Sequence, residues 1–248
     1  MFDAKSLLDQ LIGGAAGAGG APNTRSTGGG STDDLLARGQ DFLSSQGGGL
    51  ALGGLAGLML GTKTGRKVGG TAVKYGSLAL VAGLAYKAYQ GYSAKQRGVS
   101  APTYPADEPI PIEAPKGTAF DVAQQPVEEN TFALSLLTAM IAAAKADGHI
   151  DAQEQARIFD KIDEAGLDAE AKAFLMDELR APLDIDKIVR SAVTPEAGAE
   201  IYAASRLAVD PDHPAEKAYL QMLAARLGLT EGLVEEIEVA VREAEQLG

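Results

Sequence analysis

The chain has 248 residues, a formal charge of −12, two His and no Cys. The absence of Cys excludes disulfides, thiolate nucleophiles, iron–sulfur clusters and zinc sites built on cysteine. Residues 1–100 hold 10 Lys and Arg against 5 Asp and Glu, together with 23 of the 30 glycines. Residues 101–248 hold 12 against 29, a net charge of −17. The two halves need separate explanations, and we expect the protein not to bind nucleic acid.

Residues 1–45 are predicted to form short amphipathic helices and a glycine-rich linker. Apolar residues recur at helical spacing within residues 1–12, which indicates a helix that lies on another surface. Charged residues in the same stretch are not typical of a secretory signal. Residues 13–31 have few apolar side chains and predict a flexible linker.

Residues 46–97 are predicted to form one or two membrane-associated helices. Two apolar stretches, 42–62 and 68–86, each approach the length of about 20 residues that a helix needs to cross a bilayer. Glycine recurs at every fourth position, so one side of a helix would carry glycine alone, as in closely packed helices in lipid. These positions are Gly49, Gly53, Gly57, Gly61, Gly65 and Gly69. The alternative is a flexible linker or a soluble core, because glycine costs about 1 kcal/mol per helix position relative to alanine.

This glycine ladder predicts a homo-oligomer, in which the bare helix sides pack together. Basic residues behind the first stretch, at Lys63, Arg66 and Lys67, favour a cytoplasmic location for everything that follows. One crossing, two crossings and a re-entrant dip all stay open.

The remainder of the chain is predicted to be a spacer followed by an all-α domain. Residues 98–127 contain six prolines and several acids, which predict an extended, semi-rigid spacer. Apolar residues recur at helical spacing throughout 128–248, which predicts a bundle of six or seven helices. Expected helix starts and stops are Asp168, Asp184, Thr194 with Pro195, Thr230, Gly166 and Gly228.

Two acidic turns in this domain could carry chemistry. Residues 147–154, DGHIDAQE, match the second half of an EF-hand loop, but Ala143 and Lys145 stand where the first half needs carboxylates. This half-set of oxygen ligands needs a partner, and residues 210–216, DPDHPAE, offer one after a second alanine-rich helix. Helix capping is the alternative reading, because acidic residues at helix starts also bind the first free N–H groups.

The opening MFDAKSLLDQL, the glycine ladder and the acidic turns together resemble the YebE-like bacterial inner-membrane proteins. Their C-terminal domain is similar to the tellurite-resistance TerB fold, an all-helical bundle of two pseudo-repeats. This resemblance implies an inner-membrane protein whose C-terminal domain is cytoplasmic and whose turns hold a divalent metal, calcium or similar. The implied metal ligands are Asp147, Asp151, Glu154, Asp210 and Glu216. The second turn departs from the pattern, since Pro211 replaces glycine and no carboxylate matches Asp151.

The expected function is that of a membrane-anchored interaction or sensing protein, responsive to divalent metal and linked to envelope or metal stress. Its protein partner cannot be named from the sequence. One alternative is a purely structural membrane oligomer. Another is a metal-dependent hydrolase that uses the carboxylates with His149 or His213. No catalytic residue is assigned, and we do not expect an enzyme.

Overall fold

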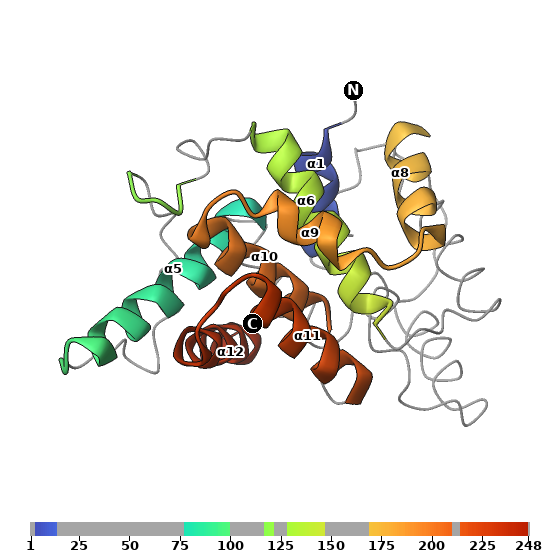
Figure 1. Ribbon diagram of the computed structural model, residues 1–248. Helices are drawn as coiled ribbons and strands as arrows, with labels where there is room; N and C mark the ends of the chain where they lie inside the picture. The colour runs from blue at the N-terminus through green and yellow to red at the C-terminus, as the bar shows by residue number, and fades with distance from the viewer. Residues whose placement is uncertain are drawn as a thin grey trace, which may run out of the picture.

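The computed structural model describes a set of helices that share one hydrophobic core (Figure 1). The described residues are 3–13, 77–99, 117–121, 128–146, 169–209 and 214–247. Within them the helices are α1 (Ala4–Gly13), α5 (Ser77–Gln96), α6 (Glu129–Ala144), α8 (Ala169–Arg180), α9 (Ile185–Ser191), α10 (Pro195–Ala208), α11 (Pro214–Arg226) and α12 (Glu231–Leu247). The described residues contain no strand, which confirms the prediction of an all-α fold.

Most of the predicted helix boundaries that fall on described residues are set by the expected caps. The Asp184 carboxylate accepts from Lys187 N at 2.9 Å, and the Thr194 hydroxyl accepts from Ala197 N at 3.1 Å. Pro195 stands at the start of α10, where a missing N–H costs nothing. Gly228 ends α11 with φ +70°, a left-handed conformation that glycine adopts without strain. The expected signals at 166 and 168 lie outside the described residues.

Two helices, α6 and α10, form the centre of the core. Residues 197–208 of α10 are all buried, and α6 is buried over most of its length. A helix that is apolar on every side belongs in the interior, surrounded by other elements. Small side chains on both helices let their backbones approach closely. The fully or almost fully buried alanines are Ala133, Ala139, Ala143, Ala197, Ala199, Ala203 and Ala204.

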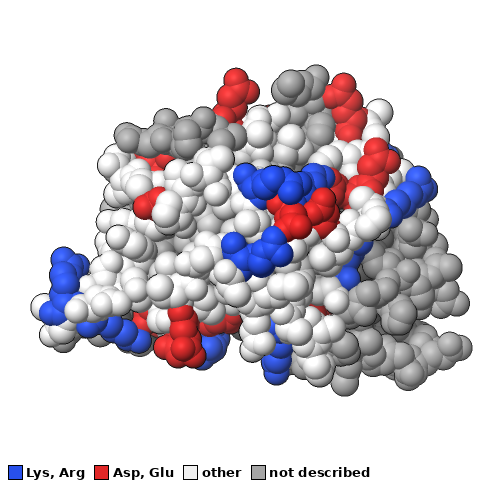
Figure 2. All heavy atoms as spheres, in the orientation of Figure 1, with Lys and Arg blue, Asp and Glu red and all other residues white. Residues whose placement is uncertain are grey.

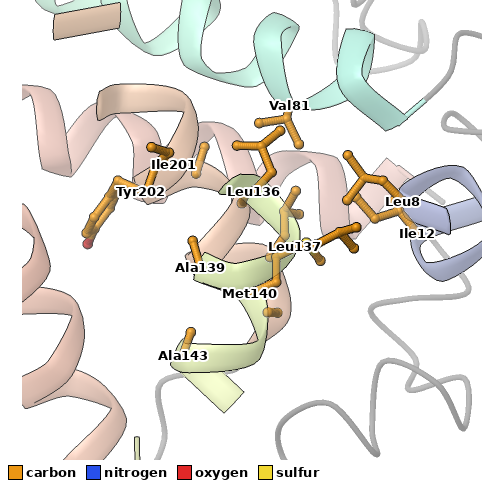
Figure 3. Packing of buried hydrophobic residues seen from close by; sticks show 14 of the residues in the cluster. Leu8, Ile12, Val81, Leu136, Leu137, Ala139, Met140, Ala143, Ile201 and Tyr202 are labelled. Carbon is orange, nitrogen blue, oxygen red and sulfur yellow. The ribbon is translucent and has the colours of Figure 1, made fainter. Parts of the chain in front are cut away.

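The N-terminal helix α1 packs into this same core. Figure 3 shows Leu8 and Ile12 of α1 close to Leu137 of α6, with Val81 of α5 over the neighbouring Leu136. Leu8 is completely buried. Ala4 N also donates to Asn130 Oδ1 at 2.6 Å, which joins the start of α1 to the start of α6. The surface on which this predicted amphipathic helix lies is therefore α6 and α5.

The helix α5 lies antiparallel along α12. Lys87 Nζ of α5 pairs with Glu243 of α12 at 2.5 Å. Further along α5, Lys95 pairs with Glu236, which lies nearer the start of α12. A Cβ atom at Gly232 would lie 3.3 Å from the Tyr92 ring, so glycine there allows the two helices to approach closely. The C-terminal helix thus covers the helix that follows the glycine ladder.

The expectation that residues 68–86 lie in a membrane stays a prediction, and only its second half falls on described residues. The described part of that stretch, from 77 onward, forms the first half of α5, and its apolar side chains are buried against other helices of the same chain. None of the helices in the described residues combines the length and the hydropathy that a membrane crossing requires. The glycine ladder itself, Gly49 to Gly69, lies outside the described residues.

A part of the predicted spacer also contacts the core. Phe120 is buried, and its ring lies 5.7 Å from that of Tyr86 and 5.5 Å from that of Tyr89, both on α5. Residues 117–121, within the predicted spacer 98–127, therefore pack against α5. The division of the chain at 45, 97 and 127 stays a prediction, although α1, α5 and Phe120 share one core with the C-terminal helices.

Candidate functional site

The predicted metal ligands fall mainly in segments beyond the described residues. Asp147, Asp151, Glu154 and Asp210 lie outside the described ranges, as do both histidines. Glu216 is described, in the first turn of α11, and only 5% of its surface is exposed. In the described part of the chain, no three acidic or histidine side chains are grouped as a metal ion requires. The structure therefore brings no ligand set together among the residues it describes.

The helix ends that flank the two acidic turns lie on the same side of the molecule. Figure 1 shows α6 and α10 both ending, and α11 beginning, toward the lower right of the view. Ser205 Oγ of α10 lies 3.4 Å from the carbonyl oxygen of Ala139 on α6, and it donates to Ile201 O at 2.9 Å. The same hydroxyl lies near the Tyr219 phenol of α11. One buried serine thus lies close to all three of the described helices that flank the turns, α6, α10 and α11.

Lys145 fixes the end of α6, immediately before the first turn. Its Nζ donates to the carbonyl oxygen of Glu178 at 2.8 Å and to that of Ala181. These carbonyls belong to the C-terminal end of α8, where a helix leaves its last acceptors unsatisfied and carries partial negative charge. Burial lowers the pKa of Lys145, and the nearby Glu178 carboxylate partly opposes that shift.

Arg206 fixes the end of α10, four residues before the second turn. Its Nη1 donates to the carbonyl oxygen of Val209 at 2.9 Å, and its Nε donates to Glu238 Oε2 at 2.8 Å. The Tyr202 hydroxyl donates to Glu238 Oε1 at 2.9 Å. Arg206 is 5% exposed, so this ion pair is largely shielded from water.

The environment of Tyr202 strongly raises the pKa of its phenol. Burial raises the pKa of the Tyr202 phenol far above its ordinary value, and the negative charge of Glu238 raises it further. The Arg206 guanidinium opposes these effects in part. Burial likewise raises the pKa of the Tyr219 phenol, and the Ser205 hydroxyl opposes part of this increase. Both phenols stay neutral throughout the physiological range and act as fixed polar groups of the core.

Sequence reasoning missed these two cationic anchors. Lys145 drew attention only because it occupies a loop position at which calcium requires a carboxylate. Arg206 interrupts an otherwise apolar helix, IYAASRLA, and that interruption is the one local sign of a buried partner. The partners themselves are about 30 or more residues away in sequence, so no local spacing could identify them.

A cavity of about 260 Å³ lies between α6, α8 and α9, next to Lys145. Apolar walls come from Ile141 and Ala142 on α6 and from Leu183 and Ile188 beyond α8. Charged side chains also line it: Lys145, Glu178, Asp184 and Lys187. Figure 2 shows acidic and basic side chains close together over the neighbouring α9, where Asp186 pairs with Arg226 of α11.

Comparisons with known proteins identify a family whose function is unknown. Residues 45–241 match the family described as "Protein of unknown function (DUF533)". A curated protein of Yersinia enterocolitica, the "Uncharacterized protein in ampR 5'region", is 31% identical over 111 residues, which are 45% of this chain and 80% of that protein. No solved structure matches the chain. Since the family model spans most of the length, the chain belongs to the DUF533 family of unknown function.

Proposed function

We propose that the protein is a membrane-associated interaction or sensing protein that responds to a divalent cation at its two acidic turns. The observation that carries this proposal is that the helices bordering turns 147–154 and 210–216 end on one side of the molecule and meet at Ser205. Carboxylate oxygens are the ligands that calcium and magnesium prefer. If the turns follow these helix ends, their two half-sets of ligands would together offer the complete set that neither turn has alone.

The position of Glu216 supports this proposal. Among the described residues it is the one proposed ligand, and it lies in the first turn of α11, at the end of the second acidic turn. Lys145 and Arg206 add further support, because they fix the backbone immediately before each turn, as a ligand-bearing loop requires.

The finer family assignment is part of the same proposal. We infer a TerB-like domain built from two helix–turn–helix units, with α6 in the first and α10–α11 in the second. The similar positions of α6 and α10 support this assignment, since both are alanine-rich, central and followed by an acidic turn. The YebE-like affiliation and the inner-membrane location rest on the order of segments along the chain.

The packing of α1 and α5 narrows the membrane topology. Both helices are part of one core with α6, α10 and α12, so both ends of segment 14–76 are attached to the same folded body. A single crossing between residues 14 and 76 would separate α1 from α5 by a bilayer. The proposed anchor is therefore a re-entrant dip, because residues 63–76 are too few for a second crossing before α5 begins. The helical bundle then lies in the cytoplasm, and the glycine ladder is the proposed oligomer contact.

Thermal unfolding of the full chain in detergent tests the cation response. We expect millimolar calcium or another divalent ion to raise the melting temperature, because a ligand at about 100 times its Kd stabilises the folded state by about 2.7 kcal/mol. Asp147→Asn and Glu216→Gln should abolish the shift. The matched control is Asp177→Asn, at an exposed position on α8. Equal shifts in all variants, or none in the parent protein, would overturn the proposed site.

Cysteine labelling tests the topology, since the chain has no Cys of its own. Ser6→Cys on α1, Gln96→Cys on α5 and Met222→Cys on α11 all place the new thiol at an exposed position. A membrane-impermeant maleimide should modify all three from the same side of sealed vesicles. Modification of Ser6→Cys and Gln96→Cys from opposite sides would contradict the shared core. Recovery of the chain in a detergent-free, high-speed supernatant would remove the membrane part of the proposal.

A further inference from the structure

We propose that the cavity between α6, α8 and α9 binds a small aliphatic carboxylate, whose head contacts Lys145 and whose chain lies on the apolar wall. This site is separate from the acidic turns. The first argument is the composition of the cavity: aliphatic surface from Ile141, Leu183 and Ile188 adjoins a lysine ammonium. Ligand sites commonly combine an apolar lining with a few polar groups that fix orientation.

The hydrogen bonds of the lining residues indicate which charge is available to a ligand. Glu178 pairs through its carboxylate with Lys187, and Asp184 accepts from the backbone N–H of Lys187. Both acids in the cavity are thus already engaged within the protein. A cationic ligand would therefore be repelled by two lysines, and both carboxylates in the lining already have partners. The cavity favours an anion.

Lys145 differs from the two acids because its described partners are neutral. An ammonium has three N–H donors, and Lys145 directs two of them to the carbonyl oxygens of Glu178 and Ala181. Its full positive charge therefore meets only backbone dipoles at contact distance among the described residues. A ligand carboxylate would accept from the third N–H of Lys145 in a charge-assisted hydrogen bond.

The volume and the walls restrict the rest of the ligand. At about 260 Å³ the cavity lies just below the range of roughly 300–1,000 Å³ typical of sites for drug-sized molecules. A chain of about four to eight carbons is the size class that fits. Leu183 is 40% exposed at the edge of the cavity and would be covered by such a chain. Each additional buried CH₂ group should then strengthen binding about 4-fold, up to the capacity of the cavity.

Isothermal titration of the full chain with sodium hexanoate tests this inference. We expect hexanoate to bind more tightly than acetate, and at least 10-fold more tightly than hexylamine or hexanol, because only the carboxylate pairs with Lys145. Lys145→Met should weaken hexanoate binding at least 10-fold. Lys217→Met, at an exposed position on α11, is the matched control and should bind as the parent protein does.

A second variant keeps the test decisive if Lys145→Met loses its fold. Leu183→Trp changes only a partly exposed side chain at the cavity edge and should block the chain-binding wall while leaving the helical circular dichroism unchanged. Loss of hexanoate binding in both folded variants would support the proposal. No heat of binding at millimolar hexanoate, equal binding of hexylamine, or unaltered binding in Leu183→Trp would overturn it.

Discussion

Replacing Leu8 with alanine tests whether α1 is an integral part of the fold. Leu8 is completely buried, and it packs where α1 meets α6 and α5 (Figure 3). Leu→Ala changes at such positions remove apolar contacts and leave a cavity, at a cost of about 2–5 kcal/mol. Domains of this size have a free energy of unfolding of about 5–15 kcal/mol. The substitution should therefore remove a large fraction of the total stability.

Urea denaturation of the full chain, followed by far-ultraviolet circular dichroism, measures this loss. The chain has no Trp, so helix content is the more informative signal. We expect Leu8→Ala to lower the urea midpoint clearly, while Ser6→Ala, at an exposed position on the same helix, leaves it almost unchanged. An unchanged midpoint in Leu8→Ala would mean that α1 adds nothing to the core. There would then be no structural reason to place both ends of segment 14–76 on the same side of a membrane.

Two further predictions concern glycine and tyrosine. Gly198→Ala should stabilise the fold by about 0.5–1 kcal/mol, because alanine favours the helix and its Cβ would meet Leu227 only at an ordinary 3.8 Å. Gly228→Ala should instead destabilise it by about 1–2 kcal/mol, since φ there is +70°; urea midpoints that move in the same direction for both would contradict this assignment. Because burial raises the folded-state pKa of Tyr202 and Tyr219, the unfolded chain alone loses these protons above pH about 10, and stability should fall by about 1.4 kcal/mol per pH unit for each phenol. Tyr202→Phe should reduce that alkaline slope, as measured by urea midpoints between about pH 8 and 11, and an unaltered slope would show that Tyr202 is not the titrating group.

The helices of the C-terminal half could be predicted because their signals are local. In α10, Thr194 and Pro195 mark the start, and apolar residues repeat at the period of the helix until Ala208. The positive φ of Gly228 follows from the same kind of local rule. Such signals depend on neighbouring residues alone, so they remain valid whatever the helix packs against.

The partner of α5 could not be predicted in this way. Leu80, Val81 and Leu84 are buried against other helices, yet the same side chains would suit a lipid environment equally well. Hydropathy measures the cost of contact with water and does not distinguish a protein interior from a bilayer. The pairing of Lys87 with Glu243 joins residues 156 positions apart, so no local pattern could predict that α5 packs on α12.

Only those parts of the candidate site whose residues lie close together in the sequence could be predicted. The two acidic turns could be recognised from their own residues and from their repetition. The anchors Lys145 and Arg206 could not, because each acts through carbonyl or carboxylate oxygens whose positions depend on the tertiary fold. The cavity beside Lys145 lies between α6 and the later helices α8 and α9, and its formation depends on the tertiary fold for the same reason.

The antiparallel pairing of α5 with α12 has a consequence for biosynthesis. Ribosomes elongate a chain at roughly 5–20 residues per second, and about 150 residues separate the end of α5 from the end of α12. A nascent chain therefore carries α5 without the cover of α12 for roughly 8–30 s. During that interval Lys87 and Lys95 lack their carboxylate partners on α12, and the side of α5 that faces α12 stays in contact with solvent. Emergence of α12 from the ribosome ends this interval.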